Sequence, residues 1–327
     1  MSLFKFRIPV LGFVALLLTA YAAQADVDLW EKDWRKTDFS RHSVDLSEIV
    51  TGGIKRDVIP AIDEPTIGEL EKARLVHDER EPVISVTVNG ATRAYPLTVL
   101  MWHEIVNDTL GGVPIAVTFC PLCNTSIVFD RRIDDQVLDF GTTGNLRFSD
   151  LVMYDRQTES WWQQFTGEGL VGKFSGEALT IIPSRVEPFA IFADRFPKAD
   201  ILERPPGFPR NYGVNPYAGY DTADEPFIPG VPKVEGIAPL AYVVAVGDEA
   251  WSLDLLRREK RVEAGDLVIA WEPGQLSVLD VSYIKESRDI GYVTVQRRTS
   301  AGLEDAHHDM TFAFAFNAFN PDGTLHQ

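Results

Sequence analysis

The two cysteines of the chain stand three positions apart, at Cys120 and Cys123 in a Cys-Pro-Leu-Cys segment. This spacing places two sulfur atoms on the same side of a turn, where they can bind one metal ion or close a small disulfide ring. Asn124 stands where a c-type haem attachment site needs histidine, which argues against haem. The pair therefore predicts a thiophilic metal site, a thiol–disulfide oxidoreductase centre, or a structural disulfide in a non-catalytic interaction protein.

The residues on both sides of the cysteine pair predict a rigid mount for it. Residues 114–119 and 126–131 are rich in β-branched and aromatic side chains, so we expect a strand on each side of the turn. A thioredoxin-like centre instead opens a helix, whose N-terminus lowers the pKa of the first thiol. The pattern therefore favours a metal-binding knuckle, with redox chemistry as the alternative.

Two thiolates do not complete a zinc site, so another part of the chain must supply further ligands. His103 is the leading candidate, because residues 97–107 have helical character and precede the strand that ends at Cys120. Asn107 would lie one helical turn beyond His103 on the same face, and Glu104, which directly follows His103, is a further possible ligand. The set predicts copper or zinc, with the softness of sulfur favouring copper. The alternative is a core histidine bonded to a backbone carbonyl.

A dense polar and aromatic stretch supplies additional candidate site residues. Its members are Asp150, Tyr154, Asp155, Arg156 and Trp162. Paired carboxylates in a cleft can perform acid–base chemistry. However, residues 155–158 have the composition of a hairpin turn, which favours a structural turn with an ion pair. His308 is a further possible ligand, although it and His307 point to opposite faces of an extended chain.

Composition excludes several classes of partner. The 327 residues include 31 Lys and Arg against 48 Asp and Glu, for a net charge of −17. This balance argues against nucleic acid and against anionic membrane surfaces. The chain also lacks a phosphate loop and a dinucleotide-binding glycine pattern, so we expect no nucleotide cofactor. A metal ion or another exported protein remains as the expected partner.

Residues 1–25 have the pattern of a secretory signal peptide. Lys5 and Arg7 precede an apolar run, and residues 23–25 form a small-x-small cleavage site, so we expect the mature chain to begin at Asp26. The run is shorter than the ~20 residues of a membrane span, and no later stretch could span a bilayer. We therefore expect a periplasmic or secreted protein in an oxidising compartment.

The strand, turn and helix signals predict an α+β fold of mainly antiparallel sheets with few helices. After an N-terminal extension at residues 26–50, residues 51–202 would form a first unit that carries the cysteine pair. Residues 203–232 contain seven prolines and four glycines, which predict a long loop over the body. Residues 233–327 repeat part of the earlier pattern and indicate a second, degenerate β-β-α-β-β unit packed on the first. Two unrelated sheet–helix–sheet segments are the alternative.

Several longer segments resemble those of a known family. They are Arg93-Ala94-Tyr95-Pro96-Leu97, Trp102-His103-Glu104-Ile105-Val106-Asn107-Asp108, Cys120-Pro121-Leu122-Cys123-Asn124-Thr125 and Asp150-Leu151-Val152-Met153-Tyr154-Asp155-Arg156. In these segments the chain resembles the prokaryotic family catalogued as domain of unknown function 3179, over most of residues 50–320. The resemblance implies uncharacterised, exported relatives that share the Cys-Pro-Leu-Cys segment. It implies no reaction, so whether the protein is an enzyme stays open.

Overall fold

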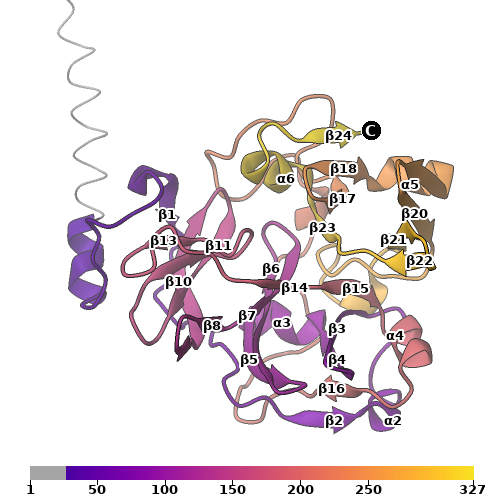
Figure 1. The fold of residues 1–327 in the computed structure, drawn as a ribbon, viewed down its shortest axis with the longest axis horizontal. Helices are drawn as coiled ribbons and strands as arrows, with labels where there is room; N and C mark the ends of the chain where they lie inside the picture. The colour runs from indigo at the N-terminus through magenta and orange to yellow at the C-terminus, as the bar shows by residue number, and fades with distance from the viewer. Residues whose placement is uncertain (1–26) are drawn as a thin grey trace, which may run out of the picture.

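The computed structural model describes residues 27–327, so the expected signal peptide and its cleavage site lie outside the described residues. Sheets dominate this part of the chain, most strand pairs are antiparallel, and the helices are short (Figure 1). The predicted α+β class is therefore confirmed. Within residues 27–327, no helix combines the length and the apolar character that crossing a membrane requires.

The first unit begins with a hairpin, a helix and a three-stranded meander. Its elements are β3 (Pro82–Val88), β4 (Ala91–Pro96), α3 (Leu97–His103), β5 (Ile105–Leu110), β6 (Val113–Cys120) and β7 (Thr125–Asp130). Asn89 and Gly90 connect β3 to β4 with φ values of 49° and 81°. These are the two positive φ values that a type I′ turn requires, so the hairpin follows directly from the Asn-Gly pair.

Later segments of the chain complete the first unit. They are β14 (Ile181–Ile182), β15 (Ser184–Pro188), α4 (Phe189–Arg195) and β16 (Asp200–Leu202). Two elements from earlier in the chain, β2 (Ile67–Glu69) and α2 (Leu70–Ala73), lie at the edge of the first unit. β15 pairs antiparallel with β3, and β16 pairs parallel with β4. The two resulting sheets have the strand orders β15-β3-β4-β16-β2 and β14-β7-β6-β5.

The second unit repeats this topology. Its elements are β17 (Tyr242–Val246), β18 (Glu249–Ser252), α5 (Leu253–Glu259), β19 (Arg261–Ala264), β20 (Leu267–Glu272), β21 (Tyr292–Thr299), β22 (Gly302–Asp305), β23 (Asp309–Phe312), α6 (Ala313–Phe319) and β24 (Thr324–His326). The strand orders are β23-β17-β18-β24 and β19-β20-β21-β22, and β24 pairs parallel with β18 as β16 does with β4. The two units therefore share the same order of strands and helices.

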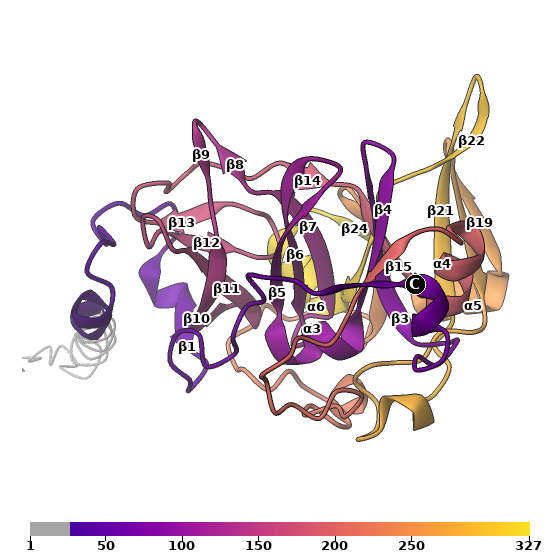
Figure 2. The same cartoon turned by 90° about the horizontal axis from the view of Figure 1, so that it is seen from below.

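A further sheet is formed by residues inserted between β7 and β14, with β1 added from the segment before the first unit. Its strands are β1 (Ile49–Thr51), β10 (Phe140–Arg147), β11 (Asp150–Asp155), β12 (Trp161–Gln163) and β13 (Gly169–Val171), and the short hairpin β8 (Arg132–Ile133) and β9 (Gln136–Val137) leads into it. Figure 2 shows this sheet at one end of the molecule and β19, β21 and β22 at the other. Trp161 and Trp162 face opposite sides of β12 and pack into different apolar clusters.

The helix expected over residues 97–107 is shorter than predicted. α3 ends at His103, Glu104 adopts a φ of 57°, and the chain continues directly as β5. Residues 105–110 are rich in β-branched side chains, and they pair along their length with β6. The expectation that Asn107 lies one helical turn beyond His103 is therefore wrong.

Candidate metal centre

A tight turn between β6 and β7 holds both thiols inside the protein. Cys120 is 2% exposed and Cys123 is fully buried. Asn124 closes the turn with a φ of 55°, in the left-handed region that asparagine tolerates better than most residues. The backbone carbonyl of Cys123 accepts hydrogen bonds from the Thr311 hydroxyl at 2.8 Å and from the Phe312 N–H at 3.1 Å. The second unit therefore holds the turn of the first.

Asp150 supplies a carboxylate to the same place. Phe148 and Ser149 connect β10 to β11 with φ values of 52° and 61°, and β11 begins with Asp150. The Cys123 thiol donates to Asp150 Oδ2 at 2.8 Å, and the Cys120 thiol points at the carbonyl of Ser149 at 3.8 Å. One donor atom from each of Cys120, Cys123 and Asp150 lies within 4.8 Å of the other two, and all three residues are buried.

The two cysteines are free thiols. The disulfide that the sequence allowed as an alternative is therefore not present, and that prediction is wrong. The physical reason is the orientation of the thiols, because each sulfur lies against an oxygen acceptor. Besides its bond to Asp150, Cys123 Sγ lies 2.6 Å from Thr125 Oγ1. A disulfide would need the two sulfur atoms at about 2.05 Å.

Burial raises the pKa values of the acidic groups at this place. It raises the pKa of Asp150 to about 6, against the hydrogen bonds from Cys123 and Gln163, which lower it. Burial likewise raises the pKa of both thiols. The pKa of Glu104 rises to about 8, first through burial and then through the charge of Asp150. A cation that binds here must therefore displace protons, so its affinity will increase with pH.

His103 lies outside this group. Its Nδ1 is 2.7 Å from the carbonyl oxygen of Pro60, and its Nε2 is 2.7 Å from the hydroxyl of Tyr212. Burial lowers the pKa of its imidazole. Because protein groups occupy both ring nitrogens, the structure places His103 in the environment of a core histidine.

Asn107 and Tyr154 also serve the framework. The Asn107 carboxamide donates to Asp63 and to the carbonyl of Phe140, and its oxygen accepts from the Phe140 N–H at 2.9 Å. These bonds use the donors and the acceptor of the side chain and fasten β5 to the inserted sheet. The Tyr154 hydroxyl donates to Asp57 at 2.5 Å.

Asp155, Arg156 and Trp162 form the hairpin that the sequence indicated. Asp155 accepts from the Thr158 N–H at 2.6 Å and from the Trp162 indole at 3.0 Å. Arg156 pairs with Asp63 at 3.1 Å, so the ion pair belongs to Arg156 rather than to Asp155. Farther along the chain, His308 is buried, with its Nδ1 3.1 Å from the carbonyl of Ala306. The structure brings none of these four residues into the Cys120–Cys123–Asp150 group.

Tyrosines of the loop at residues 203–232 close over the cysteine turn, which the sequence did not identify. The hydroxyl of the buried Tyr220 donates to the carbonyl of Leu122 at 2.8 Å. Tyr217 packs close enough to Glu104 and Cys120 for their charges to add to the effect of burial in raising its pKa. The aromatic content of this loop was the one available signal, but it does not reveal which surface the loop covers.

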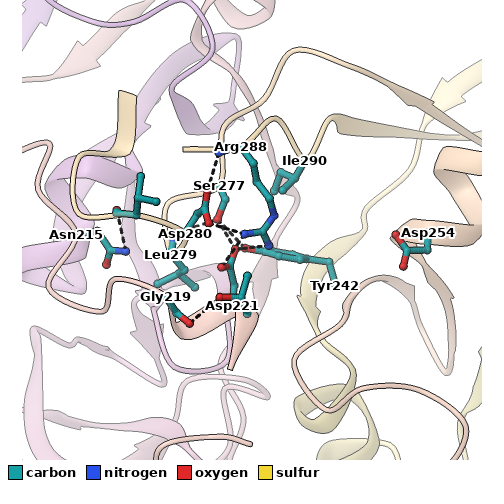
Figure 3. Close-up of polar contacts among 12 residues, drawn as sticks. Asn215, Gly219, Asp221, Tyr242, Asp254, Ser277, Leu279, Asp280, Arg288 and Ile290 are labelled. Carbon is teal, nitrogen blue, oxygen red and sulfur yellow. Dashed lines mark hydrogen bonds and ion pairs between the residues drawn. The ribbon is translucent and has the colours of Figure 1, made fainter. Parts of the chain in front are cut away.

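A polar cluster around the buried Asp221 fastens the same loop to the second unit (Figure 3). Asp221 accepts hydrogen bonds from the hydroxyls of Tyr242 at 2.8 Å and Ser277 at 2.5 Å. It also binds Arg288 at 2.8 Å, and Arg288 reaches Asp280 at 2.9 Å. Since these groups satisfy one another, the cluster explains how Tyr220, the neighbour of Asp221, is held against the cysteine turn.

The fold and the site together define a protein of two repeated α+β units, of which the first contains a buried group of two thiols and a carboxyl. The chain belongs to the family described as "Protein of unknown function (DUF3179)", whose model matches residues 56–323. No curated protein and no solved structure matches the chain.

Proposed function

We propose that this protein binds one thiophilic metal ion through Cys120, Cys123 and Asp150, and that it carries or senses that ion outside the cytoplasm. The observation that carries the proposal is the convergence of two thiols and a carboxyl within 4.8 Å of one another in a buried place. Thiolates and a carboxylate at this spacing suit one ion with metal–ligand distances of about 2.0–2.3 Å.

The donor set favours zinc over copper(I). Zinc accepts sulfur and carboxylate ligands together and keeps a fourth position open when three protein ligands bind it. Copper(I) prefers soft sulfur and gains little from a carboxylate. The proposed third ligand is thus Asp150, while the two ring nitrogens of His103 have protein partners.

Metal content tests the proposal. Protein purified without chelator is expected to contain about one zinc or copper ion per chain by elemental analysis, and Cys120→Ser and Cys123→Ser are expected to lose it. His103→Gln is the matched control, since it alters a buried neighbouring side chain without removing a proposed ligand. Metal-free wild-type protein that also fails to take up added zinc or copper(I) would refute the proposal, as would loss of metal in the control alone.

Thiol–disulfide exchange is the less supported alternative. Reactive cysteines are partly exposed and have lowered pKa values. Here Cys120 and Cys123 are 2% and 0% exposed, and burial raises the pKa of both thiols.

A further inference from the structure

A cavity of about 360 Å³ adjoins the cysteine turn without including either cysteine. Its apolar walls come from five parts of the chain: the segment before β2, α3, Leu122 of the cysteine turn, β10 and β11, and the loop at residues 203–232. Among the side chains that form them are Ile54, Val58, Met101, Trp102, Leu146 and Phe227. At about 30 Å³ for each water-sized group, this volume holds roughly a dozen non-hydrogen atoms.

Two polar side chains that line this cavity have hydrogen-bonding groups that no other residue of 27–327 engages. Glu104 is 6% exposed and Asn145 is 5% exposed, and both line the cavity. Within residues 27–327, neither the Glu104 carboxyl nor the Asn145 carboxamide takes part in a hydrogen bond or an ion pair. The polar atoms of both side chains are reached by solvent from the cavity rather than sealed within the protein. A ligand in the cavity can therefore pair with both side chains.

Two further polar groups of the lining define the chemistry of such a ligand. The Arg210 guanidinium lies 5.7 Å from the centre of the Trp102 ring and donates to the carbonyl of Val58 at 3.2 Å. No carboxylate of residues 27–327 forms an ion pair with Arg210. The Tyr217 hydroxyl, which no hydrogen bond within these residues engages, adds another donor. Guanidinium, carboxamide and phenol groups together offer hydrogen-bond donors to an acceptor with negative charge.

The electrostatics of Glu104 are consistent with an anion in this cavity. Burial and the charge of Asp150 raise the pKa of Glu104 to about 8, so it is mostly protonated at neutral pH and can donate a hydrogen bond. The titratable and charged groups that act on it or share its cavity are Asp150, Cys120, Tyr217 and Arg210.

We propose that this cavity binds a small organic carboxylate with an apolar body, whose carboxylate accepts hydrogen bonds from Arg210, Asn145 and Glu104. The apolar body lies against Trp102, Met101 and Leu146. This site goes beyond the metal site, because none of Cys120, Cys123 and Asp150 lines the cavity, although the charge of Asp150 acts on Glu104.

Three probes of equal length and different head group test the proposal: decanoate, decylamine and decanol. Each has about the dozen non-hydrogen atoms that the cavity holds. Binding to chelator-treated wild-type protein is measured by calorimetry and by tryptophan fluorescence, to which Trp102 responds. Decanoate is expected to bind at least about tenfold more tightly than the other two, since a hydrogen bond to a charged group contributes about 1.5–3 kcal/mol.

Variants locate the site. Arg210→Met and Asn145→Leu are each expected to weaken decanoate about tenfold or more, and Arg258→Met, in a different cavity of the second unit, is expected to leave its affinity unchanged. Equal or tighter binding of decylamine overturns the ligand class, and no saturable binding of any probe overturns the site. If Asn145→Leu fails to fold, the affinities of Arg210→Met, at a half-exposed position, and of the wild type for the three probes still decide the outcome. Repeating the titration with zinc present separates this site from the metal site.

Discussion

Glu104 and Lys260 occupy equivalent positions in the two units. Each follows the short helix of its unit with a φ of 57° or 61° and a ψ of −32°, and each N–H donates to the helix carbonyl four residues earlier. The carbonyl of Glu104 accepts from Phe119 N–H, and that of Lys260 from Trp271 N–H. The positive-φ backbone at this position therefore belongs to the repeat. The buried carboxyl belongs to the first unit alone, since Lys260 lies over the ring of Trp271.

Glu104→Gln is expected to change how stability depends on pH. The pKa of Glu104 rises from 4.5 to about 8 on folding, so the native state binds more protons than the unfolded state between these values. Its contribution to stability is therefore complete below about pH 4.5 and is lost as pH rises through about 8. Urea unfolding of metal-free protein across this range is expected to show a smaller decline for Glu104→Gln than for wild type. The exposed Glu304→Gln serves as control, and equal declines in all three proteins would contradict the prediction.

Asp150→Asn is expected to distinguish zinc from copper(I). It removes the carboxylate ligand and keeps the size of the side chain, so zinc affinity is expected to fall about tenfold to a hundredfold, while copper(I) affinity, which rests on the thiolates, changes little. Competition titrations with chelators of known affinity measure both. Unchanged zinc affinity would remove Asp150 from the ligand set.

Asn124 is expected to tolerate glycine but not alanine. Its φ of 55° costs a residue with a Cβ about 1–2 kcal/mol, which asparagine partly avoids and glycine does not incur. Asn124→Ala is therefore expected to lower the free energy of unfolding by about 1 kcal/mol relative to Asn124→Gly. Denaturant unfolding monitors the difference, and equal stability of the two variants would show that the turn relaxes.

Tyr220→Phe is expected to loosen the cover over the thiols. It removes the hydrogen bond to the carbonyl of Leu122, worth about 1 kcal/mol, while the ring stays in place. The rate at which a chromophoric disulfide reagent labels Cys120 and Cys123 is expected to increase about fivefold if this bond limits local opening. Tyr283→Phe, at an exposed tyrosine, is expected to leave the rate unchanged. If Tyr220→Phe is labelled as slowly as the wild type, contacts other than this hydrogen bond hold the loop over the thiols.

Much of the framework follows from local sequence. The hairpin at Asn89 and Gly90 and the strands on either side of the cysteine turn are set by turn chemistry and by β-branched residues close in the chain. The end of α3 at Glu104 is not set by local sequence, because the pairing of β5 with β6 overrides the helical pattern over residues 97–107.

The composition of the site depends on contacts between distant residues. Asp150 and Cys123 meet because the register of the inserted sheet brings β11 beside the cysteine turn, 27 positions along the chain. His103 finds its partner in Tyr212, 109 positions away. The sequence identified His103 as a metal ligand and Asp150 as a member of a dense polar stretch, but it could not reveal which of them faces the sulfur atoms.

Thr311 and Phe312 of the second unit donate hydrogen bonds to the carbonyl of Cys123 in the first. The thiol site of the first unit therefore depends on the second unit being folded. A fragment that stops before residue 309 would keep both cysteines and still lack the anchor of their turn. A truncation or substitution near the C-terminus, far from either cysteine in the sequence, would therefore first disturb the position of the two thiols.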